Sequence, residues 1–340
     1  MSDIKISSID EAFLGTTIPA SVTIELLTRC NLRCVHCYIN DYSHRGLPVE
    51  HLNSLFKKLR KLGTYRLNFT GGEIFLYDNI LDLIRMARQM GFSVNLLSNA
   101  TLLDDNLIKK LSNMRISSFG TTVFSMSDKV HDSITSQKGS LIKTLKSVEN
   151  LKKHGITVEI KTPIMEANKT SYYDVFSFSR ENNFGFSPSV TITPKLNGEM
   201  TPINLNLKGN DLNNAIIFLR ENNFLNSGKN MKDNLDDYIC TDIRNEIFIN
   251  SQGDIFPCIN YLDKLGNIYS DDIDDVCNSK KRFDIINLRK SEFKNCTNCK
   301  LAISCLPCPG LTLLETGYIL SCSSSAKRMA KIEYRLLKGG

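Results

Sequence analysis

Hydrophobic positions between residues 22 and 224 follow two patterns in turn, a short apolar run and then a longer stretch with apolar residues at helical spacing. The first pattern is typical of a buried strand and the second of an amphipathic helix. Strands are predicted at 22–27, 65–69, 92–97, 117–126, 156–164 and 187–193. Helices are predicted at 48–62, 79–90, 103–114, 140–154 and 171–182. Six strands that alternate with crossover helices indicate an α/β fold, a partial (β/α)6 parallel barrel.

Several of these strands carry polar residues at every second position, although parallel strands usually bury both faces. Each of these residues alone could be a polar group at the end of a strand. Together they predict a polar cavity inside the barrel. The residues are Arg66, Asn68, Thr70, Asn95, Asn99, Glu159 and Lys161.

After Phe224 the chain becomes rich in Asn, Asp, Gly and Cys, with only short apolar runs. Residues 222–236 are typical of a connecting loop, which places a domain boundary near residue 230. We therefore expect an N-terminal extension at 1–20, a barrel at 21–230, a small Cys-rich α+β domain at 231–325 and a C-terminal helix or tail at 326–340.

Composition narrows the class of protein. The chain has 340 residues, 41% of them hydrophobic, which is ample for a core. It has a polar N-terminus and no apolar run approaching 18 residues, so we expect no secretory signal, no membrane contact and a cytoplasmic location. Eleven cysteines in such a chain favour metal binding over disulfides and imply reducing, anaerobic conditions.

The formal net charge of +6 does not indicate a nucleic-acid partner. Basic residues are scattered along the predicted helices instead of forming blocks, a pattern typical of solvated helix faces. Thiolates bound to iron would also add negative charge that the formal count omits. We expect no nucleic acid to bind.

Cys30, Cys34 and Cys37 follow the first predicted strand within eight residues. Four thiolates normally hold a four-iron cluster, so three would leave one iron open to another ligand. The competing interpretations of this spacing are a zinc knuckle and buried thiols. Downstream, Gly71, Gly72 and Glu73 follow the second predicted strand, and residues without a Cβ let the backbone approach a ligand closely.

This three-cysteine loop and the Gly-Gly-Glu segment together resemble the radical S-adenosylmethionine (SAM) enzymes. The resemblance implies that Cys30, Cys34 and Cys37 hold a [4Fe-4S] cluster that binds SAM and cleaves it reductively to a 5′-deoxyadenosyl radical. It implies that Gly71, Gly72 and Glu73 hold the amino group of SAM. It also implies that Ser98 and Asn99 contact the ribose, and that Ser125 contacts the ribose or the methionine carboxylate.

Eight cysteines lie after residue 239, and seven of them form an ordered pattern that resembles the SPASM extension of some radical SAM enzymes. The resemblance implies two auxiliary [4Fe-4S] clusters, and hence three clusters in all. The near cluster would be held by Cys240, Cys258 and Cys308, and the distal cluster by Cys296, Cys299, Cys305 and Cys322. The chain departs from the family in having two residues instead of three before Cys308. Two zinc sites are the competing interpretation of the region.

The near cluster has only three pattern ligands, so either a further residue completes it or one iron is open. Cys277 is the obvious candidate for a fourth ligand. It lies on a predicted helix, however, and we expect it to be a buried structural thiol.

SPASM-type relatives act mostly on peptides or proteins, which makes a maturase of a ribosomally made peptide the first hypothesis. Such an enzyme would form thioether or carbon–carbon crosslinks, or epimerise residues. The alternatives are chemistry on a small molecule or haem precursor, and formylglycine formation of the anaerobic sulfatase type. About twenty residues precede the first predicted strand, so a leader peptide would be bound by a separate protein or by the barrel. The resemblance also implies an electron donor such as flavodoxin or ferredoxin.

Overall fold

The computed structural model describes residues 13, 16–225 and 230–338. Most of the expected N-terminal extension at 1–20 and the last two residues of the expected tail therefore lie outside the described residues. None of the described helices is long and apolar enough to cross a membrane.

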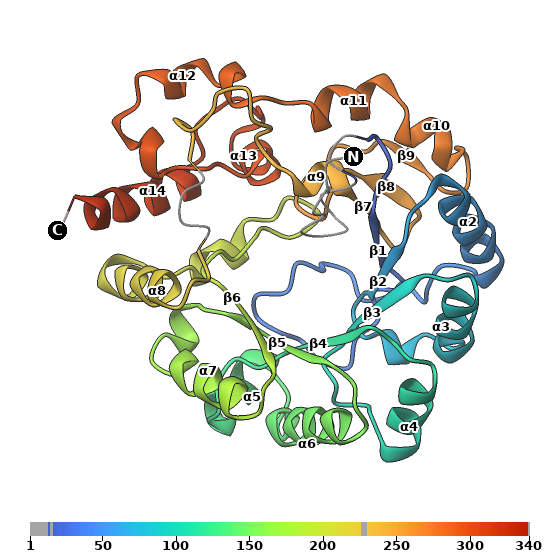
Figure 1. Ribbon diagram of the computed structural model, residues 1–340. Coiled ribbons are helices and arrows are strands. Elements are labelled where there is room, and N and C mark those ends of the chain that lie inside the picture. Colours follow the sequence, from blue (N-terminus) through green and yellow to red (C-terminus); the bar gives the residue numbers. More distant parts are fainter. Residues whose placement is uncertain (1–12, 14–15, 226–229, 339–340) are drawn as a thin grey trace, which may run out of the picture.

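The barrel contains the six predicted strands, which pair in parallel in the order of the sequence. They are β1 (Ser21–Glu25), β2 (Arg66–Thr70), β3 (Ser93–Leu97), β4 (Ser118–Thr122), β5 (Val158–Pro163) and β6 (Gly185–Ser189). The predicted helices cover the outside of this curved sheet (Figure 1). They are α2 (Val49–Leu62), α3 (Ile80–Gln89), α4 (Asp105–Asn113), α6 (Ser140–Lys153) and α7 (Tyr172–Glu181). The predicted partial parallel barrel is confirmed.

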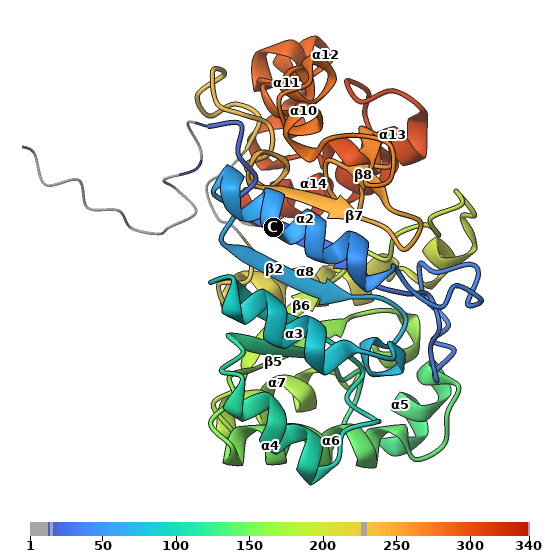
Figure 2. The ribbon, with the colours of Figure 1, turned by 90° about the vertical axis from the view of Figure 1, so that its right-hand side faces the viewer.

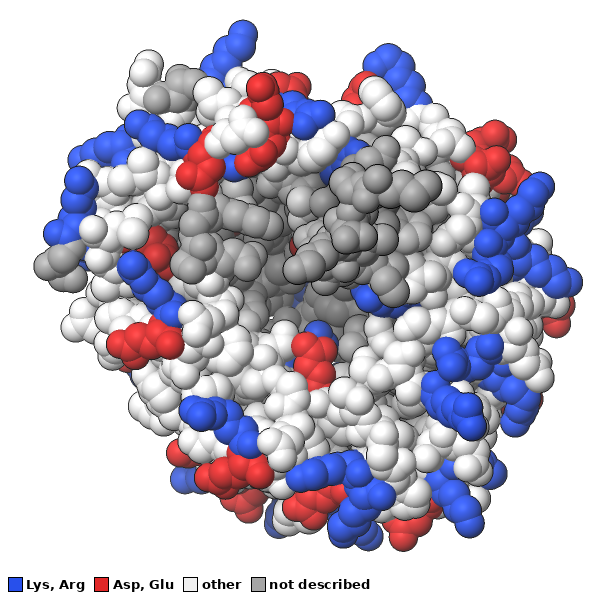
Figure 3. All heavy atoms as spheres, in the orientation of Figure 1, with Lys and Arg blue, Asp and Glu red and all other residues white. Residues whose placement is uncertain are grey.

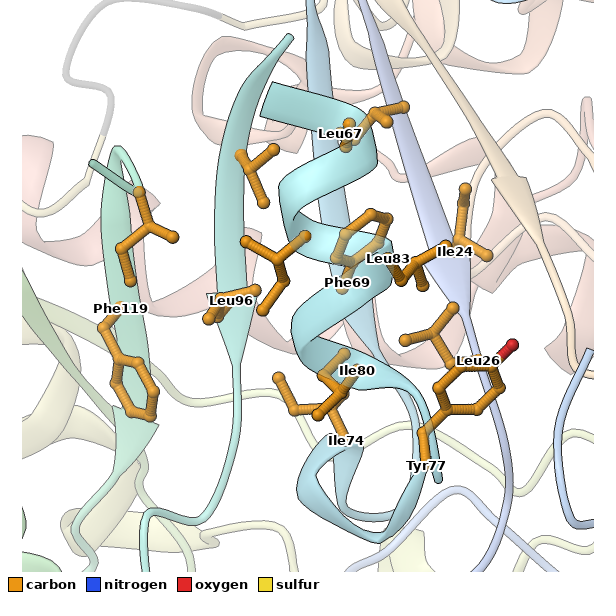
Figure 4. Packing of buried hydrophobic residues seen from close by; sticks show 14 of the residues in the cluster. Ile24, Leu26, Leu67, Phe69, Ile74, Tyr77, Ile80, Leu83, Leu96 and Phe119 are labelled. Atoms are coloured by element: carbon orange, nitrogen blue, oxygen red, sulfur yellow. The ribbon is translucent and has the colours of Figure 1, made fainter. Parts of the chain in front are cut away.

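The main hydrophobic core lies between the outer face of the sheet and these helices. Along β2, Leu67 and Phe69 are fully buried, while the polar residues between them are only partly buried. Figure 4 shows Phe69 next to Leu83 of α3, with Leu67 toward one end of the cluster and Ile74 toward the other. Burying one such side chain stabilises the fold by about 1.5–3 kcal/mol. The alternation therefore places apolar residues against the helices and polar residues toward the lumen.

Two helices of the barrel region were not predicted, α5 (Asp128–Thr135) and α8 (Gly209–Glu221). The sequence of α5 carries few large apolar residues, and two of its three buried positions are His131 and Thr135. A helix that buries polar residues leaves no clear hydrophobic stripe in the sequence. Short 3-10 turns add η1 (Ile74–Leu76), η2 (Glu166–Asn168) and η3 (Thr201–Leu205).

The C-terminal region packs along the β1 side of the barrel (Figure 2). Its strands are β7 (Glu246–Ile249), β8 (Asp254–Phe256) and β9 (Gly266–Asn267). Its helices are α9 (Asp242–Asn245), α10 (Ile273–Cys277), α11 (Lys280–Ile286), α12 (Lys294–Thr297), α13 (Pro309–Thr316) and α14 (Ser324–Leu337), with η4 (Lys290–Glu292) and η5 (Lys300–Ser304) between them. Strand β7 pairs in parallel with β1, so a single sheet has the order β6-β5-β4-β3-β2-β1-β7-β8-β9. The sheet thus continues across the expected boundary near residue 230.

Candidate active site

The lumen of the barrel is a cavity of about 630 Å³. A hollow is visible at the centre of the molecule in Figure 3. Six of the seven residues that the alternation placed inside the barrel line this cavity: Asn68, Thr70, Asn95, Asn99, Glu159 and Lys161. The seventh, Arg66, instead places its guanidinium 4.9 Å from the ring centre of Tyr65. The prediction of a polar cavity is therefore confirmed, and its volume is in the range of ligand sites.

A row of hydrogen bonds joins the polar side chains across four strands of the lumen wall. The Asn68 amide donates to the hydroxyls of Ser21 and Thr23, both at 3.0 Å. The Asn95 amide donates to Asn68 Oδ1 at 2.9 Å, and Ser118 donates to Asn95 Oδ1 at 2.9 Å. These side chains pair with one another, as buried polar groups usually do, so this row of the wall stays polar.

Cys30, Cys34 and Cys37 all line the cavity, on the loop that follows β1, and none forms a disulfide. Burial, together with the charges of Cys37 and Cys30, raises the pKa of Cys34 to about 12. The backbone N–H of Leu32 donates to Cys30 Sγ at 3.4 Å. Three neighbouring cysteines of this kind are the donor type that an iron–sulfur cluster takes.

Gly71 and Gly72 line the cavity and also pack on the chain just before Cys30. The N–H of Gly72 donates to the Leu27 carbonyl, and the N–H of Glu73 donates to the Arg29 carbonyl, both at 2.8 Å. A Cβ on Gly72 would lie 2.3 Å from the Arg29 carbonyl oxygen, and one on Gly71 would lie 2.5 Å from that of Leu27. The glycines are therefore required for contact with the cysteine loop.

Glu73 is fully buried, and its carboxylate joins the loops that follow β2 and β3. It accepts hydrogen bonds from Phe75 N at 3.0 Å, Ser98 Oγ at 2.8 Å and Asn99 N at 2.9 Å. Burial raises the pKa of Glu73, and these three hydrogen bonds lower it. The side chain of Glu73 thus holds Ser98 and Asn99, which line the cavity. A direct contact of Glu73 with SAM stays a prediction.

The other predicted SAM contacts differ in their surroundings. The Asn99 amide donates to Asn31 Oδ1 at 2.9 Å and points to Cys30 Sγ at 3.9 Å, which places it beside the cysteine loop. Ser125 is fully buried, and its hydroxyl accepts a hydrogen bond from Ser127 N at 3.0 Å. Contacts of Ser98, Asn99 and Ser125 with SAM stay predictions.

The C-terminal cysteines form two separate groups. Burial, together with charges on Cys308, Glu246 and Cys240, raises the pKa of Cys258 to about 12. Burial, together with charges on Cys296, Cys322 and Cys299, likewise raises the pKa of Cys305 to about 12. The cysteines are therefore neighbours within each of these two sets, and their roles as cluster ligands stay predictions.

Cys277 lies apart from both groups, in the main hydrophobic core. Burial raises its pKa to about 11, and its charged neighbours are Arg282, Asp274 and Asp272. This position agrees with the expected structural thiol.

Within residues 16–225 and 230–338, no three His, Cys, Asp or Glu side chains are arranged to hold a metal ion. The fit of the cysteine groups to iron–sulfur clusters rests instead on the type of donor and on which cysteines are neighbours.

One residue of the site was not among those predicted from the sequence. Glu246 lines the cavity and neighbours Cys258. Burial raises the pKa of Glu246 to about 7, and nearby Asp242 adds to this shift. Residues 246–258 form a hairpin in which Phe248 pairs with Phe256. Glu246 lies two residues before this pair and Cys258 two residues after it, and this symmetric spacing was the available signal.

Two family models match the chain. The model of the radical SAM superfamily matches residues 24–167, and the model of the iron–sulfur cluster-binding SPASM domain matches residues 240–300. The chain therefore contains a radical SAM domain, followed by a C-terminal SPASM domain.

Curated relatives match part of the chain. The antilisterial bacteriocin subtilosin biosynthesis protein AlbA of Bacillus subtilis (strain 168) is 28% identical over 182 residues, 49% of this chain and 41% of AlbA. The Fe-coproporphyrin III synthase of Methanosarcina barkeri (strain Fusaro / DSM 804) is 27% identical over 163 residues, 47% of this chain and 41% of that protein. The match spans less than half of the length of each of these relatives.

Solved structures match nearly the whole chain. Streptococcus suis SuiB bound to the precursor peptide SuiA has a TM-score of 0.70 at 15% identity, over 92% of this chain and 76% of SuiB. The native protein anSMEcpe with bound AdoMet has a TM-score of 0.70 at 20% identity, over 94% of this chain and 97% of that chain. At these identities the likeness shows the shared fold alone.

Proposed function

We propose that this protein is a SAM-cleaving enzyme that modifies a peptide, most simply one made on the ribosome. The observation that carries the proposal is the position of Cys30, Cys34 and Cys37 on the wall of a polar lumen, next to Gly71 and Gly72. Cys30, Cys34 and Cys37 would hold the SAM-binding cluster, which, once reduced by an external electron donor, would supply the chemistry for reductive cleavage of SAM and hydrogen abstraction from the substrate.

The residues of the chain bind and orient the reactants. The backbone of Gly71 and Gly72 offers polar groups to the SAM amino group beside the cysteine loop. Ser98 and Asn99, held by Glu73, present a hydroxyl and an amide on the same wall. The surrounding barrel wall limits access of water to a reactive radical, which protects it from side reactions.

The opposite side of the lumen is proposed to hold the substrate. Glu159 and Lys161 lie on β5 with their charged groups 3.6 Å apart and both line the cavity. Such a pair offers one acceptor and one donor of charge-assisted hydrogen bonds to the polar backbone of a peptide.

A peptide substrate is supported by the relatives whose names refer to bacteriocin and killing-factor maturation. It is also supported by the shared fold with SuiB, whose solved structure holds a precursor peptide. The modification would be a thioether or carbon–carbon crosslink, or an epimerisation. The partners would be the peptide, a separate leader-binding protein and an electron donor such as flavodoxin or ferredoxin.

Chemistry on a haem precursor is the second candidate. The observation that favours it is the similarity to Fe-coproporphyrin III synthase and to AdoMet-dependent heme synthase of Methanosarcina barkeri. Formylglycine formation of the anaerobic sulfatase type would use the same radical step on a serine or cysteine side chain.

The first experiment measures 5′-deoxyadenosine formed from SAM by anaerobically reconstituted, reduced protein. We expect the wild type to form it and the variant with Cys30→Ala, Cys34→Ala and Cys37→Ala to form none while keeping the iron of the C-terminal clusters. Cys277→Ala is the matched control and should keep the activity. Undiminished cleavage by the triple variant would contradict the assignment of the SAM cluster.

The second experiment separates the candidate substrates. Synthetic peptides encoded by open reading frames beside the gene and, separately, Fe-coproporphyrin III are added to the reduced protein with SAM. A peptide substrate predicts faster formation of 5′-deoxyadenosine and a mass change in one peptide. Faster cleavage with the porphyrin alone would favour the second candidate.

A further inference from the structure

Glu246 is the first residue of β7, and it lines the wall of the lumen cavity. Strand β7 pairs antiparallel with β8, with Phe248 opposite Phe256 and their ring centres 6.2 Å apart. Strand β8 ends at Phe256, and continuing this register by two residues beyond that end would bring Glu246 level with Cys258. The two side chains are close enough for their charges to interact.

The other thiols of the near group converge on the same place. Cys240 packs with Cys258 in one hydrophobic cluster. Helix α13 begins directly after Cys308, and its backbone lies so close to the segment after Cys258 that a Cβ on Gly310 would be 2.5 Å from the Asn260 carbonyl oxygen. Cys240, Cys258 and Cys308 are therefore neighbours beside the hairpin, and Glu246 lies close to Cys258.

The carboxylate of Glu246 has no hydrogen-bond or ion-pair partner among the residues that the structure describes. The side chain is partly buried and faces the lumen cavity, so its carboxylate is accessible to a group bound there. Among the charges close to it, Asp242 acts on Glu246, and Glu246 in turn acts on Cys258.

We infer that Glu246 is the fourth ligand of the near auxiliary cluster, with a carboxylate oxygen on the iron that Cys240, Cys258 and Cys308 leave open. The inference rests on the auxiliary cluster of the proposed function and not on the identity of the substrate. Cys277, the alternative fourth ligand, lies instead in the hydrophobic core. Because iron–sulfur clusters favour soft thiolate ligands, a cysteine at position 246 should hold the same iron.

The experiment uses the full chain with Cys30→Ala, Cys34→Ala and Cys37→Ala, so that only the auxiliary clusters are observed. Glu246→Ala, Glu246→Gln and Glu246→Cys are each added to this parent, with Glu159→Ala as the control for loss of another lumen carboxylate. Iron per chain and the electron paramagnetic resonance spectrum of the reduced protein are measured, with and without cyanide as a probe for an open iron.

The parent and the Glu159→Ala control should hold about eight irons, two clusters of four, and cyanide should leave their spectra unchanged. Glu246→Ala and Glu246→Gln should either lose about four irons or gain a signal that shifts with cyanide. Glu246→Cys should keep about eight irons and show no shift.

Three results would overturn the inference: a shift of the parent's spectrum with cyanide, unchanged iron and spectra in both Glu246→Ala and Glu246→Gln, or loss of about four irons from Glu246→Cys. These measurements need neither SAM nor substrate. Failure of the proposed function would show separately, as a wild type that forms no 5′-deoxyadenosine while its auxiliary clusters behave as described.

Discussion

Gly72→Ala tests whether the close packing of two backbone segments positions the cysteine loop. The new Cβ would lie 2.3 Å from the Arg29 carbonyl oxygen and 2.4 Å from that of Thr28. Both obstacles are backbone atoms, so no side-chain rotation relieves the overlap. The segments must separate by about 1 Å to reach an ordinary contact distance.

The cost follows from what that separation disrupts. Two backbone hydrogen bonds join the segments, Gly72 N to Leu27 O and Glu73 N to Arg29 O, each at 2.8 Å. Each is worth about 0.5–1.5 kcal/mol, and overpacking adds about 1–3 kcal/mol. Alanine also lowers the conformational entropy of the unfolded chain, which offsets this cost by about 0.4–1 kcal/mol. We expect the free energy of unfolding to fall by about 2–5 kcal/mol.

The assay is anaerobic urea denaturation of the reconstituted protein, together with iron per chain. Because Arg29 precedes Cys30, we expect Gly72→Ala also to lose about the four irons of the SAM cluster. Gly185→Ala on β6 is the matched control, since its new Cβ would meet Glu159 at an ordinary 3.5 Å. If Gly72→Ala were as stable as the control and held the same iron, the close contact would not be what positions the loop.

Three further outcomes are expected. Glu73→Gln places an N–H donor opposite the N–H of Asn99, where the carboxylate had been an acceptor. The free energy of unfolding should therefore fall by about 1–3 kcal/mol, and SAM should bind more weakly in equilibrium dialysis. No change in either measurement would contradict the role of Glu73. Cys277→Ala should keep all its iron, and its free energy of unfolding in urea denaturation should fall by about 1 kcal/mol or less. Loss of about four irons would instead make Cys277 a cluster ligand. Burial lowers the pKa of His131 to about 4, below its pKa in the unfolded chain. Between these two pKa values the unfolded state binds more protons than the folded state. The free energy of unfolding therefore falls as the pH drops. From pH 7 to pH 5 this residue alone should cost about 2 kcal/mol, and His131→Gln should lack that part of the pH dependence of the denaturation midpoint.

Local patterns in the sequence were sufficient for the barrel. In β2, alternation of polar residues with Leu67 and Phe69 both predicted a strand and assigned its two faces, because side chains of a strand point alternately to opposite sides. Helix α5 was missed because it buries His131 and Thr135, which a search for apolar spacing does not detect. The local rule fails where buried positions are polar.

Contacts between distant segments were not predictable from local patterns. Nothing in the spacing around Ser21 indicates that it pairs with Glu246, more than two hundred residues away. The glycines illustrate the same limit, since the sequence predicted a close approach at Gly71 and Gly72 without revealing that Leu27 and Arg29 are the neighbours. The two cysteine sets were proposed from the resemblance to the SPASM extension, since spacing alone does not determine which cysteines share a cluster.

The parallel pairing of β1 with β7 makes β1 a rigid spacer between the loop that carries Cys30 and the start of β7. The loop with Cys30 follows the carboxyl end of β1, whereas Glu246 pairs with Ser21 at the opposite end of that strand. The five residues of β1 span about 16 Å at roughly 3.3 Å per residue. The distance between the cysteine loop and Glu246 is therefore determined by a strand that is paired on both sides, so it would stay constant even if the loops at the mouth of the barrel moved.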